Sequence, residues 1–439
     1  MQESLIGFAI LLVLIAIRIP IAFAMGLVGV VGFALLVSWS GALAMVATVT
    51  YETGLAYGLS VVPLFILMGN FVTRAGLSDE LYKAANAFLG HRRGGLAMAT
   101  VVACGGFGAV CGSSLATAAT MAPVAMPSMR RYGYSDSLAA GSIAAGGTLG
   151  ILIPPSVILV IYGIMTESDI GKLFMAGILP GVLGVILYMA AVQATIWIKP
   201  ESGPPGERFG WGDRMRAIGG VWGVLLLFML VMGGIYGGIF TPTEAAGIGA
   251  TGAFFFALAR GRLSIAIIYD ILLQSVKTTT MIFSVLIGAL MFSNFVNMAD
   301  LPGALTGWVH GTNLSPYMVM LFMILVYVVL GCVLESMSMI LLTVPVFYPL
   351  IQELNFGPSI PSDMVLIWFG IIVVVVTEIS LITPPVGLNV FVLRGVLPDV
   401  GTGTIFKGVT PFWIADIVRL LILIFLPAVS LLLPGLMGR

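Results

Sequence analysis

The sequence predicts an all-α polytopic membrane protein. Hydrophobic residues make up 59% of the 439 residues and charged residues only 9%, whereas soluble proteins average about 45–50% and about 25%. The mean hydropathy is +1.13. Apolar stretches recur along the whole chain, and a helix that crosses a bilayer needs about 20 such residues. The chain is therefore expected to cross the membrane many times.

The charge balance and the scarce reactive residues exclude several classes of protein. The 19 Lys and Arg residues are balanced by 19 Asp and Glu residues and form no basic stretch, which excludes nucleic-acid binding. Cys104, Cys111 and Cys332 all lie in apolar stretches, where an odd number favours packing over disulfides. Only His91 and His310 are available for a histidine metal site, which is too few.

Apolar runs mark the expected spans. The first run, 4–17, is interpreted as an uncleaved helix, because its leader lacks a side-chain cation and Arg18 follows the apolar residues. Three stretches, 94–166, 315–352 and 377–398, are also apolar but rich in Gly, Ser, Thr and Pro. The other runs lie near 21–38, 53–73, 173–198, 218–238, 243–258, 277–297, 364–398 and 409–436.

The distribution of Lys and Arg sets the topology. The positive-inside rule places the loop from Lys199 to Arg216 and the segment 260–262 in the cytoplasm. The rest of the chain obeys the rule if residues 95–129 and 315–352 each enter and leave the membrane on one side. Both are therefore predicted to be re-entrant hairpins, entered from opposite sides. Their polar tips survive at membrane depth only inside protein or beside a wet cavity.

A helix interrupted by two prolines follows each hairpin. Pro154-Pro155 breaks the first helix and Pro384-Pro385 breaks the second, and superposing the two pairs shifts the register by slightly more than half of the chain. Proline removes an amide donor and clashes with the carbonyl one turn back, so two in succession unwind a helix. Hairpin plus broken helix thus occurs twice, which is the inverted-repeat signature of a secondary transporter.

The breaks predict how ions and substrate bind. Carbonyls freed before each proline pair need partners in a low-dielectric medium, and Na⁺ supplies one while Ser and Thr hydroxyls complete its oxygen shell. The half-helices expected to restart at Pro155 and Pro385 present N–H groups and a positive dipole end, which suit an anionic substrate.

These arguments give three sets of candidate residues. The first Na⁺ site is predicted at Gly112, Ser113, Ser114, Thr148, Ile151 and Pro154. The second Na⁺ site is predicted at Glu335, Ser336, Thr377, Thr383, Pro384 and Gly387. Substrate is expected to contact Ser114, Pro155, Ser156, Ser338, Pro385, Asn389 and Arg394.

Several residues allow a second interpretation. Glu335 and Glu378 lie at membrane depth, where acids are functional candidates for ion binding or proton sensing, yet each is also explained as a buried acid satisfied by backbone amides. Arg394 meets a substrate carboxylate or snorkels to the interface. Glu244 favours a helix cap, because Thr241 precedes it by three residues. Gly108 and its glycine neighbours favour close helix packing.

No enzyme class finds support in the sequence. It contains no His-Glu-x-x-His zinc motif and no Gly-x-x-x-x-Gly-Lys-[Ser/Thr] loop, so the chain is not expected to hydrolyse ATP. Ser113 and Ser114 have no histidine in a comparable apolar segment to act as a base. The energy for transport must then come from an ion gradient or from another subunit.

At these residues the chain resembles the large membrane subunit of the tripartite ATP-independent periplasmic (TRAP) transporters. The resemblance runs over nearly the whole chain and includes the Thr241-Pro242-Thr243-Glu244 segment. It rests on Gly112-Ser113-Ser114-Leu115-Ala116-Thr117, Gly147-Thr148-Leu149-Gly150, Ile153-Pro154-Pro155-Ser156, Glu335-Ser336, Thr343-Val344-Pro345 and Ile382-Thr383-Pro384-Pro385-Val386-Gly387-Leu388-Asn389.

The resemblance implies a mechanism and partners. Such subunits are elevator transporters in which a scaffold holds a mobile domain built from both hairpins and both broken helices. They use Na⁺, here expected as two or more ions, and receive an organic acid such as a dicarboxylate, sialic acid, sugar acid or keto acid from a periplasmic binding protein. They also work with a small four-helix membrane subunit. That partner is expected as a separate chain, because this sequence starts close to the first large-subunit helix.

The same resemblance sets the predicted domains and location. The chain is expected in the inner membrane of a bacterium or archaeon. Its parts are scaffold helices at 1–92, the first half of the transport domain at 93–170, scaffold helices with a central loop at 171–300, the second half at 301–400 and a C-terminal helix at 401–439. A stand-alone Na⁺- or H⁺-coupled organic anion symporter of the same fold is the alternative. A channel is disfavoured, because intramembrane charge is scarce.

Overall fold

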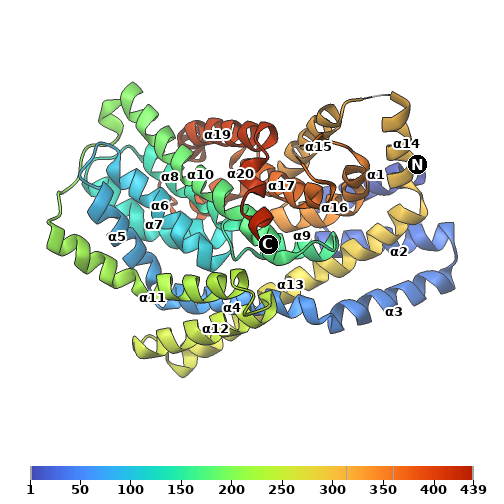
Figure 1. Cartoon of the computed structure of the whole chain (residues 1–439), viewed down its shortest axis with the longest axis horizontal. Helices are drawn as coiled ribbons and strands as arrows, with labels where there is room; N and C mark the ends of the chain where they lie inside the picture. Colours follow the sequence, from blue (N-terminus) through green and yellow to red (C-terminus); the bar gives the residue numbers. More distant parts are fainter. Residues whose placement is uncertain (1, 313, 359, 438–439) are drawn as a thin grey trace.

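The protein is built from helices of very different lengths (Figure 1). The computed structural model describes residues 2–312, 314–358 and 360–437, and all regular elements in these ranges are α-helices or short 3-10 turns. Seven helices in these ranges are long and apolar enough to cross a membrane. The all-α polytopic architecture predicted from composition is confirmed.

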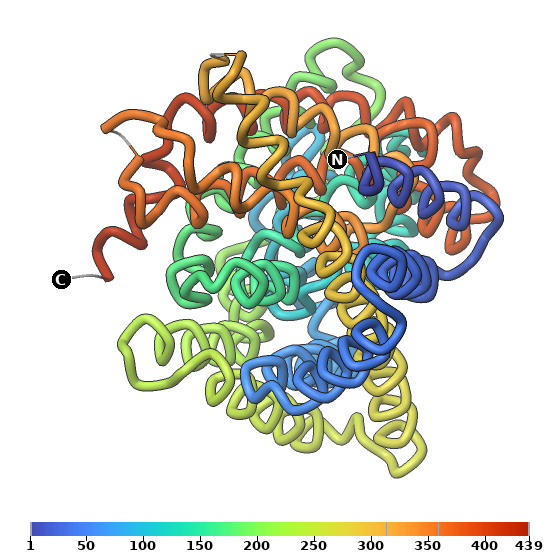
Figure 2. Tube along the Cα trace, turned by 90° about the vertical axis from the view of Figure 1, so that its right-hand side faces the viewer, coloured from blue at the N-terminus to red at the C-terminus, as the bar shows by residue number. Residues whose placement is uncertain are grey.

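One side of the molecule consists of N-terminal and central helices. In both views α3, α4, α11, α12 and much of α13 lie along the same side (Figures 1 and 2). An added Cβ on Gly288 would lie 2.3 Å from the carbonyl oxygen of Ala22, so the backbones of α2 and α13 touch. The N-terminal and central helices of the chain, on this side and elsewhere, are α1 (Gln2–Ala16), α2 (Ile21–Leu36), α3 (Trp39–Leu55), α4 (Val61–Arg74), α11 (Trp211–Tyr236), α12 (Pro242–Ala259) and α13 (Ile265–Met298).

Two of these helices depart from the sequence prediction. The expected span 277–297 is the second half of α13, a single helix of 34 residues. The expected span 53–73 is confirmed for the most part, because the turn η1 (Tyr57–Ser60) and α4 together, Tyr57–Arg74, are long and apolar enough to cross a membrane, while residues 53–55 belong to α3. Helix α3 was not predicted; the Ser38 side chain caps its start by accepting a hydrogen bond from the Gly41 amide at 3.1 Å.

The predicted hairpins and broken helices are both present. The first hairpin is α6 (Gly95–Cys111) and α7 (Ser114–Arg131), and the second is α15 (Pro316–Gly331) and α16 (Ser336–Glu353). The first broken helix consists of α8 (Asp136–Thr148), the turn η2 (Leu149–Ile151) and α9 (Val157–Met165), and the second of α17 (Val365–Ile382) and α18 (Leu388–Val396). The opposite orientation of the two hairpins in the bilayer stays a prediction.

The starts of the half-helices were predicted wrongly by a few residues. They were expected at Pro155 and Pro385, but α9 begins at Val157 and α18 at Leu388. The proline pairs, both joined by cis peptide bonds, belong to the turns that precede these helices. The Ser156 side chain caps α9, and Gly387, the residue before α18, has a left-handed φ of 60°.

The second helices of the two hairpins, α7 and α16, match closely. Helices α7 and α16 are both 18 residues long, and each has prolines at its tenth and fourteenth positions. These are Pro123 and Pro127 in α7, and Pro345 and Pro349 in α16. Helices α9 and α18 also match, at nine residues each. The repeat is therefore visible in helix length as well as in the proline pairs.

Connecting helices surround the repeats. Helix α10 packs against α6, α9, α17 and α19, and α19 packs against α8. An added Cβ on Gly408 would lie 1.9 Å from the carbonyl oxygen of Ser137, so α19 and α8 cross in direct backbone contact. The predicted domain boundaries, including the one at 170, stay predictions. These helices are α5 (Leu77–Leu89), α10 (Ile170–Ile198), α14 (Leu301–Thr312), α19 (Thr402–Phe425) and α20 (Ala428–Leu431), with turns η3 (Pro200–Ser202), η4 (Ser362–Met364) and η5 (Pro434–Leu436).

The C-terminal region is not the single span expected at 409–436. Helix α19 ends at Phe425, and Pro427 separates it from the short helix α20. Proline cannot continue a helix in its interior without loss of a hydrogen bond, which accounts for the break. The core of the molecule is centred on α17, whose 18 residues are all buried. The buried part of the apolar run expected at 364–398 is therefore its first half, while the second half, from Thr383 on, includes exposed residues such as Phe391.

Candidate transport site

A cavity of about 200 Å³ lies where the two hairpin tips meet. Residues 111–116 of the first tip and 335–337 of the second line it, together with Val157 and Leu388, the first residues of α9 and α18. Asn70 of α4 and Thr278 of α13 line it from another direction. Elements from both repeats and from the N-terminal and central helices thus share one cavity.

The first tip is a tight turn stabilised by hydrogen bonds of Ser113 and Thr117. Gly112 has a φ of 63°, and an added Cβ there would lie 3.3 Å from the carbonyl oxygen of Pro155. The Ser113 hydroxyl accepts a hydrogen bond from the Ala116 amide at 3.3 Å and so caps α7. The Thr117 hydroxyl donates to the Ser113 carbonyl at 2.7 Å. The tip therefore packs against the turn that contains the first proline pair.

The second tip is longer, with four residues (332–335) between its helices against two in the first, and its helix is capped by a carboxylate in place of a hydroxyl. The Glu335 carboxylate caps α16, accepting hydrogen bonds from the Ser338 amide at 2.9 Å and the Ser338 hydroxyl at 2.8 Å. The Cys332 sulfur lies 3.6 Å from the carbonyl oxygen of Pro384 and 3.2 Å from that of Val328 in its own helix, so its single proton is shared between the two acceptors. This tip therefore rests on the second proline break, and Glu335 brings a formal negative charge to the cavity.

The structure brings six of the predicted ion-site residues to the cavity. They provide hydroxyl, carboxylate and backbone carbonyl oxygens from both repeats. They are Gly112, Ser113, Ser114, Ile151, Glu335 and Ser336.

Three predicted ion ligands point elsewhere. The Thr148 hydroxyl donates to the Ala145 carbonyl at 2.8 Å and lies 3.2 Å from the Tyr188 hydroxyl. The Thr377 hydroxyl donates to the Val373 carbonyl at 2.8 Å. The Thr383 hydroxyl donates to Ile379 and accepts from the Trp413 indole at 2.8 Å. Neither these threonines nor Pro154, Pro384 and Gly387 line the cavity. Thr148 and Thr377 lie within α8 and α17 and are left out of the ion sites proposed below, whereas Thr383, Pro384 and Gly387 lie in the turn between α17 and α18 and are kept for their backbone carbonyls.

Most predicted substrate contacts are buried structural residues. Asn389 is fully buried, accepts a hydrogen bond from the Ser114 hydroxyl at 2.7 Å and donates to the Ala144 carbonyl at 2.9 Å. The buried Ser156 hydroxyl donates to the Ile151 carbonyl at 2.5 Å. Ser338 is committed to Glu335. Of the predicted substrate set, only Ser114 lines the cavity, while Pro155 and Pro385 lie in the turns behind the tips.

Arg394 does not face the cavity. Its guanidinium donates to the carbonyl oxygens of Pro398 and, at 2.7 Å, of Val400, beyond the end of α18. It therefore satisfies carbonyls at a helix end, a common role for arginine. Glu244 caps α12 as predicted, since its carboxylate accepts from the Thr241 amide at 2.8 Å and Thr241 caps in return. Gly108 packs closely as predicted, with its added Cβ 2.3 Å from Gly150 Cα.

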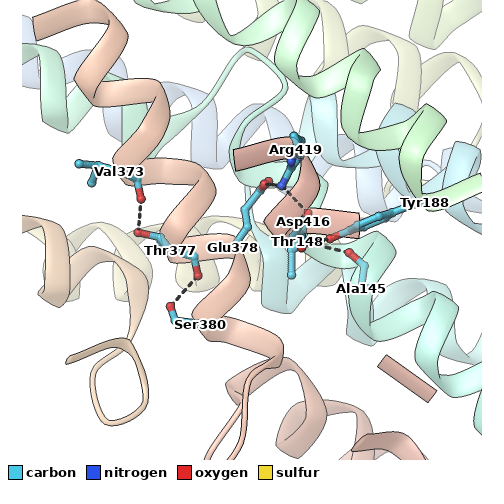
Figure 3. A network of polar contacts seen from close by, with 9 residues as sticks. All are labelled: Ala145, Thr148, Tyr188, Val373, Thr377, Glu378, Ser380, Asp416 and Arg419. Carbon is cyan, nitrogen blue, oxygen red and sulfur yellow. Dashed lines mark hydrogen bonds and ion pairs between the residues drawn. The ribbon is translucent and has the colours of Figure 1, made fainter. Parts of the chain in front are cut away.

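A buried polar cluster near the second broken helix was missed from the sequence (Figure 3). Glu378 of α17 forms an ion pair with Arg419 of α19, rather than being satisfied by backbone amides. Arg419 also lies 2.8 Å from Asp416, whose other oxygen accepts from the Tyr188 hydroxyl at 2.6 Å. The signal was available, because Asp416 and Arg419 are three residues apart in an otherwise apolar run.

Two polar-tipped hairpins that close on one cavity, each followed by a broken helix, define a membrane transporter. The chain belongs to the TRAP transporter family: the model described as "Tripartite ATP-independent periplasmic transporter, DctM component" matches residues 8–429. It is therefore a multi-pass large permease subunit and not an enzyme. The family works with a small membrane subunit and a periplasmic binding protein, as predicted.

Individual relatives agree with this assignment. The C4-dicarboxylate TRAP transporter large permease protein DctM of Pseudomonas aeruginosa is 39% identical over 390 residues, covering 88% of this chain and 88% of that protein. The isethionate TRAP transporter permease protein DctMQ of Oleidesulfovibrio alaskensis is 31% identical over 434 residues, covering 98% of this chain and 65% of that protein.

A solved structure shares the fold. The transporter YdaH of Alcanivorax borkumensis, described as having an unusual topology, superposes with a TM-score of 0.55 at 15% sequence identity. The superposition covers 99% of this chain and 98% of the YdaH chain. At this identity the likeness concerns the fold alone.

Proposed function

We propose that this permease takes a small organic acid from a periplasmic binding protein and moves it into the cytoplasm, driven by Na⁺. The observation that supports this most is the cavity, because both hairpin tips line it together with α4 and α13. In an elevator mechanism the hairpins and broken helices carry the bound substrate past a fixed scaffold. A cavity at the boundary between those two groups of helices is where such a mechanism needs its site.

The oxygen atoms at the two tips fit Na⁺, a hard cation that prefers oxygen ligands. The first proposed site uses Gly112, Ser113, Ser114 and the carbonyl of Ile151. The second uses Glu335 and Ser336, with carbonyls of the turn at Pro384 and Gly387. Thr383 contributes to the second site through its backbone. We infer at least two ions, one at each tip, because each tip has its own oxygen donors.

The proposed substrate is an anion held without a basic side chain. Among the described residues that line the cavity, none is Lys or Arg. Val157 and Leu388 begin nine-residue helices at the cavity, and helix N-termini attract anions through their free amides and dipoles. Together they supply about one unit of positive charge. The names of the two relatives above suggest a dicarboxylate or a sulfonate as the first substrates to test.

The partners and the location follow from the proposed role. The large permease is proposed to pair with a small membrane subunit on a separate polypeptide, and to lie in the cytoplasmic membrane of a bacterium. A stand-alone Na⁺- or H⁺-coupled symporter is the alternative.

Uptake into proteoliposomes separates the two proposals. The permease is reconstituted with its small membrane subunit, and labelled C4-dicarboxylate is added with or without the binding protein and a Na⁺ gradient. Uptake that requires both the binding protein and the Na⁺ gradient supports the proposal. Equal uptake without the binding protein favours the stand-alone symporter, and equal uptake with a proton gradient in place of Na⁺ contradicts Na⁺ coupling.

A further inference from the structure

The buried cluster at α17 contains more acid than base. Glu378, Asp416 and Arg419 are each 0% exposed, and Figure 3 shows both carboxyl groups directed at the one guanidinium. The groups that face Glu378 are Arg419 and Asp416 of α19, with Tyr188 of α10 behind Asp416. Thr148 of α8, which is not titratable, completes the cluster through the Tyr188 hydroxyl.

The charge of this cluster is unbalanced if both acids are ionised. Two carboxylates and one guanidinium give a net charge of −1 in a dry region. An uncompensated buried charge is very unfavourable, so a buried group generally takes or loses a proton instead. Neither Glu378 nor Asp416 lines the cavity at the hairpin tips, so an ion bound there does not contact this cluster.

The number of donor groups near each acid indicates which carboxylate is less stabilised as an anion. Asp416 interacts with two donors: the Tyr188 hydroxyl at 2.6 Å from one oxygen and the Arg419 guanidinium at 2.8 Å from the other. Glu378 interacts with one donor group, Arg419, through Oε2. One oxygen of each acid, Oε1 of Glu378 and Oδ1 of Asp416, is buried without a hydrogen bond among the described residues, but Oδ1 of Asp416 lies at ion-pair distance from Arg419. Donors stabilise an anion, so the carboxylate of Asp416 is favoured over that of Glu378.

We propose that Glu378 holds a proton and that Asp416 and Arg419 form the ion pair. The cluster is then electrically neutral and joins the second broken helix to α19 and α10. The proton is resident: it stays with the protein during transport and is not one of the ions that drive it. Glu378 is therefore a proton-binding residue that positions α17, not a ligand for Na⁺ or substrate.

Infrared spectroscopy of the wild-type protein tests this without any substitution. Glu378 and Asp416 are the only buried acidic side chains among the described residues, so a protonated carboxyl that resists alkaline pH comes from this cluster. Permease with its small subunit is prepared with heavy carbon in the carboxyl groups of glutamate or of aspartate. The resistant carboxylic acid band is expected to shift with labelled glutamate only. A shift with labelled aspartate only, the absence of such a band, or its loss on addition of Na⁺ overturns the proposal.

Transport by neutral variants provides a second test. Glu378→Gln keeps the shape and the neutral charge, so it is expected to remove the band while uptake and its dependence on Na⁺ and pH stay unchanged. Asp416→Asn removes the anion that pairs with Arg419 and is expected to lower the thermal stability. Glu353→Gln, at an exposed acid, is the control that changes neither. Loss of uptake in a folded Glu378→Gln protein, with uptake retained in Asp416→Asn, contradicts the proposal. If Glu378→Gln does not fold, the labelled wild-type spectra decide.

Discussion

The two hairpins have the same backbone plan but different chemistry at their tips. The second helix of each hairpin is 18 residues long with prolines at matching positions, and each tip contacts a carbonyl oxygen of a proline pair. The first is capped by the Ser113 hydroxyl and the second by the Glu335 carboxylate. Because formal charge strengthens cation binding, the comparison implies that the two proposed Na⁺ sites differ in affinity although their scaffolds match.

The contact between hairpin and broken helix differs as well. In the first half an added Cβ on Gly108 would lie 2.3 Å from the Cα of Gly150, a contact of backbone with backbone. In the second half an added Cβ on Gly331 would lie 2.3 Å from the Cβ of Ser380, a contact of backbone with side chain. The second contact has a side chain that is open to substitution, and the first has none.

The largest expected effect is from alanine at Gly108. Gly108→Ala is expected to lower the free energy of unfolding by about 1–3 kcal/mol or more, because two backbones have to separate. Gly331→Ala is expected to destabilise similarly, but Ser380→Gly in the same chain removes the obstructing Cβ and restores stability. The thermal midpoint of the purified proteins is the measurement. If Ser380→Gly fails to restore Gly331→Ala, the Ser380 side chain is not what obstructs a side chain at position 331.

The next effect separates the two tips by their Na⁺ dependence. Loss of one oxygen from an ion site costs about 1–3 kcal/mol, or about 5- to 150-fold in affinity. Glu335→Gln is expected near the top of that range because it removes a charge, and Ser113→Ala near the bottom. The Na⁺ concentration for half-maximal uptake measures both.

The control for the Ser113 variant is the loss of a helix cap elsewhere. Ser135 caps α8 by accepting from the Leu138 amide at 3.3 Å, the same length as the Ser113 bond, and it does not line the cavity. Ser135→Ala is expected to leave the Na⁺ dependence unchanged. An equal shift in Ser135→Ala and Ser113→Ala attributes the effect to the cap rather than to an ion.

A smaller effect concerns a hydrogen bond that joins the first tip to the second half of the chain. The Ser114 hydroxyl donates to Asn389, which in turn donates to Ala144. In a double-mutant cycle, Ser114→Ala and Asn389→Ala are expected to be coupled by about 0.5–1.5 kcal/mol in stability. Additive effects would mean that the bond does not link the two halves.

The smallest effect is at an exposed ion pair between the halves. Arg130 of α7 lies 2.5 Å from Asp399, which follows α18. The hydrogen bond from Arg130 holds the pKa of Asp399 below its usual range, so its contribution is present at neutral pH and is lost as the pH falls through that lowered value. Asp399→Asn is expected to change stability only slightly, because surface pairs contribute little. A large loss of stability at neutral pH would contradict this.

The sequence predicted the features that depend on proline and small residues. The two hairpins, the two breaks and the tip residues Ser113, Ser114, Glu335 and Ser336 were found because proline and polar tips are local signals. The structure confirms the two helical hairpins and the two breaks, while re-entry of the hairpins into the membrane from opposite sides stays a prediction and the ion sites remain proposals. The matching prolines of α7 and α16 were visible in the sequence but overlooked.

Side-chain direction was beyond sequence reasoning. Thr148, Asn389 and Arg394 have suitable chemistry and suitable positions along the chain, yet the structure turns each toward a buried or terminal partner. Direction is set by tertiary packing rather than by spacing. The hydrogen bond of Glu378 with Arg419 is similar, because its two members lie far apart in the sequence and meet only in the folded chain.

Protection of cysteines at the two tips tests the central claim, that both tips enclose one cavity in which Na⁺ ions and substrate bind. Leu115 and Met337 line the cavity from opposite tips and are not proposed as ligands. In a chain without Cys104, Cys111 and Cys332, cysteine at 115 or 337 is labelled in the reconstituted transporter, with Lys172→Cys as the control outside the cavity. We predict that Na⁺ with dicarboxylate-loaded binding protein slows labelling at both tips and not at 172. Protection at one tip alone, or at neither, would contradict a shared site.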